Sequence, residues 1–273
     1  HNASDFPVAL ADIDHIEVLE GAASRVFGTS AFNGAINIVT KKAKSEGVSA
    51  SVEGGSFGSF GAQGRIQTAF ETGKWTQAYS VSGGYKRSDG GTENSDFEKG
   101  QGYGNLSFSY DQRFDIIAQL GIASQSYGAN TFYSAKYNNQ YEKTDHGLAS
   151  LNLSLHNQEK TWEIAPQFYY NKFKDHYQLI RGTQIGENYH DLDVYGGGLN
   201  ANVAWALGKT AVGFDISKEC IYSTALGEEL AEKDYKDISG SDRQYTRKGE
   251  RTNTNIMLEH NFIFGGFTLS AGV

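Results

Sequence analysis

The sequence predicts an all-β protein whose strands form the wall of an antiparallel transmembrane β-barrel. Three observations support this prediction. Apolar and polar residues alternate from about Val48 onward, short and long connections follow one another along the chain, and the composition is rich in Gly (33), Tyr (16) and Phe (16) but poor in Pro (2). Barrel strands meet lipid with every second residue, and aromatic rings favour the membrane surfaces, so this combination is typical of membrane barrels.

The alternation predicts which face each residue occupies. We count roughly eleven alternating segments, most of them near or above the about 9–11 residues that a tilted membrane strand needs. Because successive residues of a strand point to opposite faces, one set should meet lipid and the other the lumen. We expect Leu151, Leu153, Leu155, Val203 and Trp205 to face lipid, and Asn152, Ser154, Asn200 and Asn202 to face the lumen.

Pro166 fits this pattern least, because it lies in the middle of a predicted strand. A proline has no backbone N–H to give to a neighbouring strand. We therefore predict a β-bulge at this position.

The connections indicate the two sides of the membrane. Apart from a brief first loop near 56–59, short turns alternate with long polar segments, as in barrels with short periplasmic turns and long extracellular loops. The short turns are at 72–74, 111–113, 157–160, 208–209 and 265–266, and the long segments are 88–100, 128–144, 179–190 and 223–250. Aromatic residues gather near the short turns, as at an interfacial belt. A soluble β-sandwich, the competing fold, requires neither feature.

Several classes of protein are excluded or disfavoured. The net charge of -8 argues against a nucleic-acid partner. No run of about 18 apolar residues occurs, so a helical membrane span is excluded. The single Cys220 cannot form an intrachain disulfide. Residues 54–58 match the letters of a hydrolase nucleophile turn, but they connect two strands instead of a strand and a helix. We expect no enzymatic activity and no required cofactor.

Residues 13–40 carry the most specific pattern of the chain. They read as a short strand (Ile16–Leu19), a turn and helix of small residues (Gly21–Phe27) and a second strand (Ala35–Thr40). The segment resembles the end of the plug domain of TonB-dependent outer-membrane receptors. The residues that match the family pattern are Ile16, Glu17, Val18, Leu19, Gly21, Ser24, Phe27, Gly28, Ala31, Gly34, Ile36, Asn37, Ile38 and Thr40.

This resemblance implies a fold, a location and an activity. The family fold is a barrel of about 22 strands filled by a plug. Residues 1–46 would then be the C-terminal part of the plug and residues 47–273 the first half of the barrel, the rest being missing. The family takes up scarce nutrients across the bacterial outer membrane with energy from TonB. The implied partners are TonB, a small-molecule nutrient and outer-membrane lipid, with a surface lipoprotein as an optional one.

The plug segment departs from the family at two positions. Glu20 stands where the family usually has Arg, and Ala22 stands where it usually has Pro. Arg25 is available to supply the displaced positive charge. We expect Glu17, Glu20 and Arg25 to form the ion pairing between plug and barrel, because an unpaired buried charge is costly.

Five aromatic residues in and beside one long segment are the candidate substrate-binding residues: Tyr127, Phe132, Tyr133, Tyr137 and Tyr141. Rings at a loop tip can hold a large planar ligand, and they can equally anchor the wall at the membrane surface. Because the first strands and loops are similar to those of the cobalamin receptor, we expect cobalamin as the substrate. A ferric siderophore or haem is the alternative. A passive porin or an adhesin barrel is the alternative of another class. A porin would carry no plug segment before its first strand, and an adhesin would need repeats that the sequence does not show.

Four carboxylates are candidate calcium ligands: Asp89, Glu93, Asp96 and Glu98. Their segment resembles the acidic, calcium-binding loop of the cobalamin receptor, and calcium takes six to eight oxygen ligands. An acidic surface loop that is simply solvated is the alternative. Calcium is therefore expected only as an optional cofactor.

Overall fold

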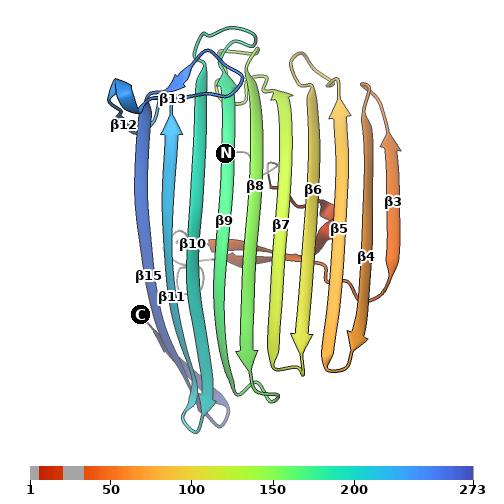
Figure 1. Ribbon diagram of the computed structural model, residues 1–273, viewed down its shortest axis with the longest axis vertical. Coiled ribbons are helices and arrows are strands. Elements are labelled where there is room, and N and C mark those ends of the chain that lie inside the picture. Colours follow the sequence, from red (N-terminus) through yellow and green to blue (C-terminus); the bar gives the residue numbers. More distant parts are fainter. Residues whose placement is uncertain (1–5, 21–33, 273) are drawn as a thin grey trace.

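The computed structural model describes residues 6–20 and 34–272. The described chain is built around one antiparallel sheet, in which eleven strands follow one another in chain order (Figure 1). We call this sheet the wall. Its strands are β3 (Gly47–Gly54), β4 (Phe60–Thr72), β5 (Trp75–Ser88), β6 (Phe97–Tyr110), β7 (Phe114–Gly128), β8 (Tyr141–His156), β9 (Trp162–Gln178), β10 (Asn188–Trp205), β11 (Gly208–Ser223), β15 (Arg247–Phe264) and β16 (Phe267–Gly272).

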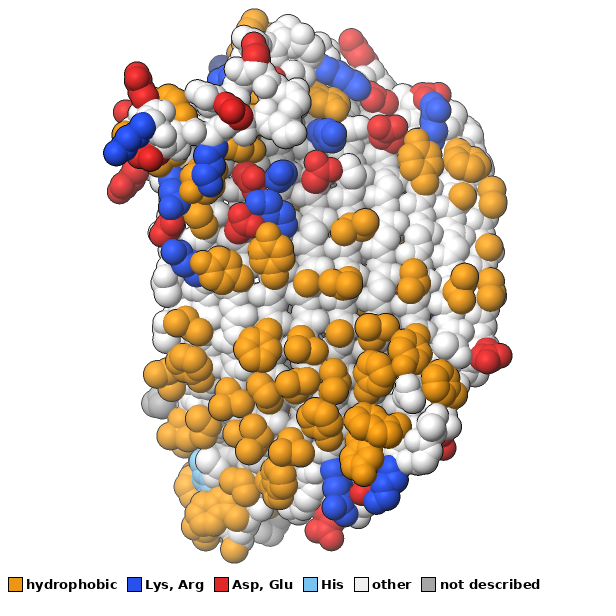
Figure 2. Space-filling view, in the orientation of Figure 1, with side chains coloured by type: hydrophobic (Ala, Val, Ile, Leu, Met, Phe, Trp, Pro, Cys, Tyr) orange, Lys and Arg blue, Asp and Glu red, His pale blue; other side chains and the backbone are white. Residues whose placement is uncertain are grey.

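Most wall strands are longer than a membrane requires. β4 has 13 residues, and β10 and β15 have 18 each. At about 3.3 Å per residue, 18 residues span about 60 Å, roughly twice the thickness of the hydrocarbon layer before tilt is considered. The distribution of side chains on the outer face agrees with strands that are longer than the hydrocarbon layer is thick. Apolar side chains gather over its lower part, and charged side chains lie mostly above them, towards the long loops (Figure 2).

The longest connection of the wall has structure of its own. Between β11 and β15 it contains β12 (Glu228–Glu229), η4 (Glu232–Asp234), β13 (Lys236–Asp237) and β14 (Gln244–Tyr245). β12 pairs with β15, and β13 pairs with β14. No helix among the described residues is long and apolar enough to cross a membrane.

The two predicted faces of the wall are present. Gln119 of β7 donates a hydrogen bond to Thr40 of the plug segment and accepts one from Ser150 of β8, so these side chains lie on the inner face. The alternation of β8 carries this face on to Ser154, which shares Glu163 as a hydrogen-bond acceptor with Asn202. The opposite face carries the exposed side chains Leu151, Leu155, Val203 and Trp205.

Pro166 does not form the predicted bulge. Pairing between β8 and β9 stops at Asn152–Gln167 and resumes at Leu155–Ile164 without a shift of register. On the β10 side the pairing is continuous. The missing N–H of the proline interrupts the ladder but inserts no extra residue. The prediction of a bulge is therefore wrong, and the proline leaves a local gap in the pairing.

A small hairpin precedes the wall and lies behind it in Figure 1. η2 (Leu10–Asp12) leads into β1 (Ile13–Glu20), which pairs antiparallel with β2 (Gly34–Thr40). Because the sequence predicts that it belongs to a plug domain, we call this unit the plug hairpin. Both predicted strands of the segment are present, and β1 is longer than expected. The predicted helix at residues 21–27 lies outside the described residues.

Candidate functional site

A buried ion pair attaches the plug hairpin to the inner face of the wall. Asp12, the last residue of η2, is fully buried, and Arg65 of β4 is 8% exposed. The Asp12 carboxylate accepts hydrogen bonds from the Arg65 guanidinium and from the Ser82 hydroxyl of β5. Arg65 also donates to the Lys41 carbonyl oxygen at 3.4 Å. Because a buried charge is costly unless it is paired and hydrogen-bonded, these contacts hold the hairpin against β4 and β5.

A second contact joins the end of β2 to β6 and β7. The Thr40 hydroxyl oxygen accepts hydrogen bonds from the Tyr103 hydroxyl at 3.1 Å, from Gln119 Nε2 at 3.0 Å and from Asn105 Nδ2 at 3.4 Å. Tyr103 and Asn105 are both buried. One small side chain of the plug hairpin thus gathers donors from two neighbouring strands of the wall.

The ion pairing predicted for the plug has a different outcome at each residue. Glu17 accepts a hydrogen bond from Asn37 at 2.7 Å and lies 3.3 Å from the His15 ring, so it is engaged inside the plug hairpin. The side chain of Glu20 and the whole of Arg25 lie outside the described residues. Pairing among Glu17, Glu20 and Arg25 therefore stays a prediction. The described ion pair between plug and wall uses other residues, which the sequence pattern did not identify.

At the loop end of the wall, two of the predicted tyrosines hold a buried carboxylate. Glu142 of β8 is 5% exposed and accepts hydrogen bonds from the hydroxyls of Tyr127 and Tyr133. Tyr127 lies near the end of β7, and the register pairs it directly with Glu142. Glu142 shares its parity along β8 with Ser150, so both paired residues point to the inner face, where the plug hairpin lies.

Two further rings extend this group. The Phe132 and Tyr133 rings meet edge to face at 4.8 Å, and the Tyr133 and Tyr177 rings do so at 5.3 Å. The Tyr177 hydroxyl donates to Gln140 at 2.7 Å, and the fully buried Gln140 amide donates to carbonyl oxygens of the loop at 134 and 137. We call Tyr127, Phe132, Tyr133, Tyr177 and Glu142 the ring cluster.

The other two predicted rings lie elsewhere. Tyr141 precedes Glu142 on β8 and therefore points to the outer face. Its ring lies 4.9 Å from the Arg181 guanidinium. Tyr137 contributes its carbonyl oxygen to the Gln140 contact, while its ring is exposed. The structure thus brings together three of the predicted aromatic residues and adds Tyr177 and Glu142.

Three long loops are tied to one another at this end of the wall. Arg181 donates two hydrogen bonds to Asp96, at 2.6 and 2.9 Å. Asn94 donates to the carbonyl oxygens of Asn138 and Gln140 at 3.0 and 2.6 Å. The hydrogen bonds from Arg181 hold the pKa of Asp96 below its usual value of 3.8. We call the loops 89–96, 129–140 and 179–187 the loop network.

The four carboxylates predicted to bind calcium are each held by a different partner. They are Asp89 with Arg87, Glu93 with Asn138, Asp96 with Arg181, and Glu98 with Tyr85. Across residues 6–20 and 34–272, no group of three or more His, Cys, Asp or Glu side chains has an arrangement that would hold a metal ion. The structure does not bring these carboxylates into one site, so calcium binding stays a prediction that the present geometry does not support.

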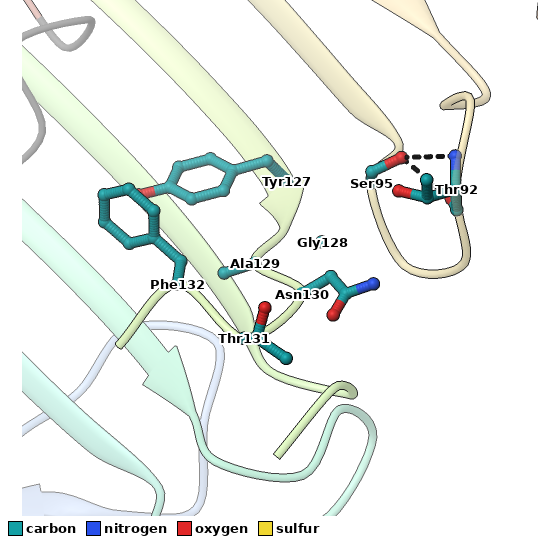
Figure 3. A pocket seen from close by; sticks show the side chains of 8 residues that line it. All are labelled: Thr92, Ser95, Tyr127, Gly128, Ala129, Asn130, Thr131 and Phe132. Carbon is teal, nitrogen blue, oxygen red and sulfur yellow. Dashed lines mark hydrogen bonds between the residues drawn. The ribbon is translucent and has the colours of Figure 1, made fainter. Parts of the chain in front are cut away.

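A pocket of about 330 Å³ opens between two of the loops (Figure 3). One side is formed by Thr92 and Ser95, whose hydroxyl contacts the Thr92 backbone, and the other side by the end of β7 and the loop after it. The residues that line it are Thr92, Ser95, Tyr127, Gly128, Ala129, Asn130, Thr131 and Phe132. This lining offers hydroxyl groups, an amide and two aromatic rings, and carries no formal charge.

Comparisons with known proteins identify the fold. No protein-family model and no curated protein matches the chain. The solved structures that the chain resembles include the copper transporter OprC (17% identity, TM-score 0.72, 42% of that protein), the ferric citrate transporter FecA in its unliganded form (16%, 0.72, 43%) and the FrpB iron transporter from Neisseria meningitidis (17%, 0.70, 46%). Each of these three matches covers 97% of this chain.

These likenesses establish the fold and its extent. The chain spans less than half of the length of each of these three proteins. At such low identity the similarity concerns the fold, which is the eleven-strand antiparallel part of a barrel that we predicted. The fold class is confirmed. All three similar proteins are named as transporters and none as an enzyme.

Proposed function

We propose that the chain is part of a TonB-dependent receptor that takes up a metal chelate across the bacterial outer membrane. One observation carries this proposal. The plug hairpin lies on the polar inner face of a membrane-type wall and is held there by the buried contact of Asp12 with Arg65 and Ser82. A segment fixed inside the wall obstructs free diffusion, so passage requires energy that displaces it.

The two faces of the wall support the proposed location in the outer membrane. Its outer face carries a band of apolar side chains below a charged region (Figure 2), and side chains of the inner face are polar where they meet the plug hairpin. This arrangement suits a barrel that is surrounded by lipid and filled by a plug. TonB as the energy source, and a surface lipoprotein as a further partner, stay predictions from the resemblance of residues 13–40.

For the substrate, the comparisons favour the ferric-chelate alternative over cobalamin. The similar structures are named as transporters of copper, ferric citrate and iron. The tyrosine-rich loops that suggested cobalamin are compatible with either substrate, because aromatic rings bury apolar area of any large ligand. We therefore propose a ferric chelate as the substrate class and keep cobalamin as an outcome to be tested.

The ring cluster and the neighbouring pocket are the proposed capture site. The pocket of about 330 Å³ is large enough for part of a chelate, and its neutral lining can exchange hydrogen bonds through Thr92, Asn130 and Thr131. Glu142 lies beside it as a buried carboxylate. A negative charge at that place disfavours a strongly anionic ligand, so the geometry suits a chelate with little net charge, such as a ferric hydroxamate.

A transport assay tests this function. The intact receptor is expressed in a strain that lacks its own ferric receptors, and uptake of labelled ferric hydroxamate, ferric citrate, copper and cobalamin is measured with and without TonB. We expect uptake of the hydroxamate that disappears without TonB. Uptake that persists without TonB would identify a passive channel instead. Uptake of cobalamin alone would retain the receptor class and replace the substrate.

A further inference from the structure

Glu142 differs from the other buried carboxylates among residues 6–20 and 34–272. The other three each face a basic side chain, in the pairs Asp12–Arg65, Asp175–His190 and Glu187–Arg243. Glu142 is 5% exposed and forms no ion pair with a described Lys, Arg or His side chain. Its described side-chain partners are the hydroxyls of Tyr127 and Tyr133. Because a buried charge without an opposite charge is costly, a cation at this place would be strongly stabilised.

Three oxygen atoms of these side chains converge. Both phenol hydroxyls donate to the same carboxylate oxygen, Oε2 of Glu142, and the two phenol oxygens lie 3.2 Å apart. Neighbouring oxygen ligands of a small octahedral cation, with bonds of about 2.0–2.1 Å, are separated by about 2.9 Å. The spacing of the phenol oxygens is therefore close to that of two ligands of one metal ion. We call Tyr127, Tyr133 and Glu142 the oxygen triad.

The wall and one loop position the oxygen triad. Tyr127 and Glu142 are direct partners in the register of β7 and β8, so two of the three donors stand on neighbouring strands. Tyr133 comes from the loop between these strands, and its ring meets those of Phe132 and Tyr177 edge to face. The Tyr127 side chain points away from Thr92 and Ser95, towards Phe132 (Figure 3). Because Tyr133 is 44% exposed, the triad can be reached from the loop side.

The donor atoms and their charges select the kind of cation. The triad offers oxygen alone, which suits hard cations, and no nitrogen or sulfur, which copper and zinc bind well. A phenol keeps its proton at neutral pH, so it becomes a ligand only where a strongly charged cation favours the phenolate. Two phenolates and one carboxylate carry three negative charges in total. A trivalent cation balances these charges, whereas a divalent cation leaves a buried negative charge unbalanced.

We propose that the oxygen triad binds ferric ion directly, through the two phenol oxygens and the Glu142 carboxylate. Water or hydroxide ligands leave the iron as the three protein oxygens bind. Each phenol proton passes to a displaced hydroxide or to solvent, and the iron stays ferric. The proposal rests on the proposed function, because it assigns the metal ion of the substrate to this site. A ferric hydroxamate that fills all six positions of the iron would contact the rings without coordination, so the triad would receive iron from carriers that release it.

A titration of the intact, metal-free receptor in detergent with ferric nitrilotriacetate, a soluble carrier that exchanges its iron, tests this site. Iron bound to phenolate gives a visible charge-transfer band that neither the carrier nor a free phenol shows. We expect this band to rise and to saturate at one iron per receptor. Calcium chloride in excess should not displace the iron, because it does not replace the phenol protons.

Conservative variants identify the ligands without removing a ring. Tyr127→Phe and Tyr133→Phe should each lower the band and weaken iron binding by about a hundredfold or more, since even an outer-shell partner of a metal is worth about 10–100-fold. Glu142→Gln keeps both phenols and should weaken binding for the lost charge. Tyr137→Phe is the matched control, because it removes a phenol of the same loop whose ring is exposed and lies outside the triad. Thermal melting shows that each variant is folded.

Three results would overturn the proposal. They are the absence of the band at saturating ferric nitrilotriacetate, a band that persists when Tyr127 and Tyr133 are both replaced by Phe, and displacement of the iron by calcium, which would make the site one for a divalent cation. The uptake assay separates this inference from the proposed function. Uptake of ferric hydroxamate that depends on TonB, without the band, would retain the function and reject the iron site. The band without any such uptake would retain the iron site and reject the function.

Discussion

The plug contact and the loop network are each held by an arginine–aspartate pair, but the two pairs lie in very different surroundings. Arg65 and Asp12 are 8% and 0% exposed, whereas Arg181 and Asp96 are 38% exposed each. Water screens the second pair and competes for its hydrogen bonds. The first pair is shielded from water, so water cannot replace its hydrogen bonds when they are lost. The same chemistry should therefore act as a strong attachment in one region and as a weak, adjustable one in the other.

The largest effect should come from breaking the buried pair on one side only. Asp12→Ala leaves the Arg65 guanidinium buried without its carboxylate, which we expect to destabilise the docked plug hairpin by about 3–5 kcal/mol. Hydrogen exchange of residues 6–20 in the intact receptor measures this. The double variant Asp12→Leu with Arg65→Met removes both charges and should cost less than the single change. If the double variant is as unstable as the single one, the pair acts through shape and not through charge.

The ring cluster should show the next largest effect, mainly on ligand binding, with a smaller loss of stability because Tyr133 also donates a hydrogen bond to the buried Glu142. Replacing both Phe132 and Tyr133 with Ala removes two neighbouring rings, and we expect a loss of about 2–4 kcal/mol in binding of the ferric hydroxamate. Tyr137→Ala is the matched control, because its exposed ring lies in the same loop but outside the cluster. Equilibrium binding with thermal melting separates the two roles. Unchanged affinity with a lowered melting temperature would make these rings structural anchors.

The contact at Thr40 should have an intermediate effect on the attachment of the plug hairpin. Thr40→Val keeps the shape of the side chain but removes the hydroxyl oxygen that Tyr103, Gln119 and Asn105 share. Buried donors that lose an acceptor cost about 1–3 kcal/mol. Thr40→Ser retains the oxygen and should be close to the unaltered protein in hydrogen exchange of β2. Equal protection of β2 in the valine and serine variants would contradict this role.

The wall was predictable from the sequence because its signal is local. A residue and its second neighbour share a face, so the alternation around Leu151 and Val203 is enough to assign the apolar and the polar face of the wall. The bulge predicted at Pro166 failed because the proline removes a donor without adding a residue. The same parity would also have placed Tyr141 on the outer face and Glu142 on the inner face, had it been extended to the end of β8.

The attachment of the plug was not predictable in this way. Asp12 and Arg65 are 53 residues apart, and no periodic pattern relates an η2 residue to a strand of the wall. The available signal was a charged residue on the polar side of a strand, which is common in barrels. Family resemblance directed attention to Glu17, Glu20 and Arg25 instead. Tyr177 of β9 was missed for a similar reason, because its contact with Tyr133 depends on how the loop after β7 packs against the wall strands.

The smallest effect should be the pH response of the loop network, where the exposed pair of Asp96 and Arg181 joins two loops. Because Arg181 lowers the pKa of Asp96 below 3.8, the pair contributes stability that is fully present above the unfolded value of 3.8 and is lost as pH falls through the folded pKa. An exposed pair contributes only about 0–1 kcal/mol. Hydrogen exchange of the loops 89–96 and 179–187 should therefore change little between pH 7 and pH 5 and accelerate, relative to the intrinsic rate, only near pH 3.

Arg181→Ala separates this pair from the other acid-sensitive groups of the protein. It should loosen both loops slightly at neutral pH and should abolish the additional loosening at low pH, because Asp96 then has no partner to lose. Arg181→Lys keeps the charge but not the two parallel hydrogen bonds. The loosening of the loops in this variant should therefore lie between that of the unaltered protein and that of Arg181→Ala. The plug contact at Asp12 serves as the internal reference in the same measurement, since Arg181 does not touch it. If Arg181→Ala loosens residues 6–20 as much as the loops, the two regions are coupled, and the contrast between a strong inner attachment and a weak outer one does not hold.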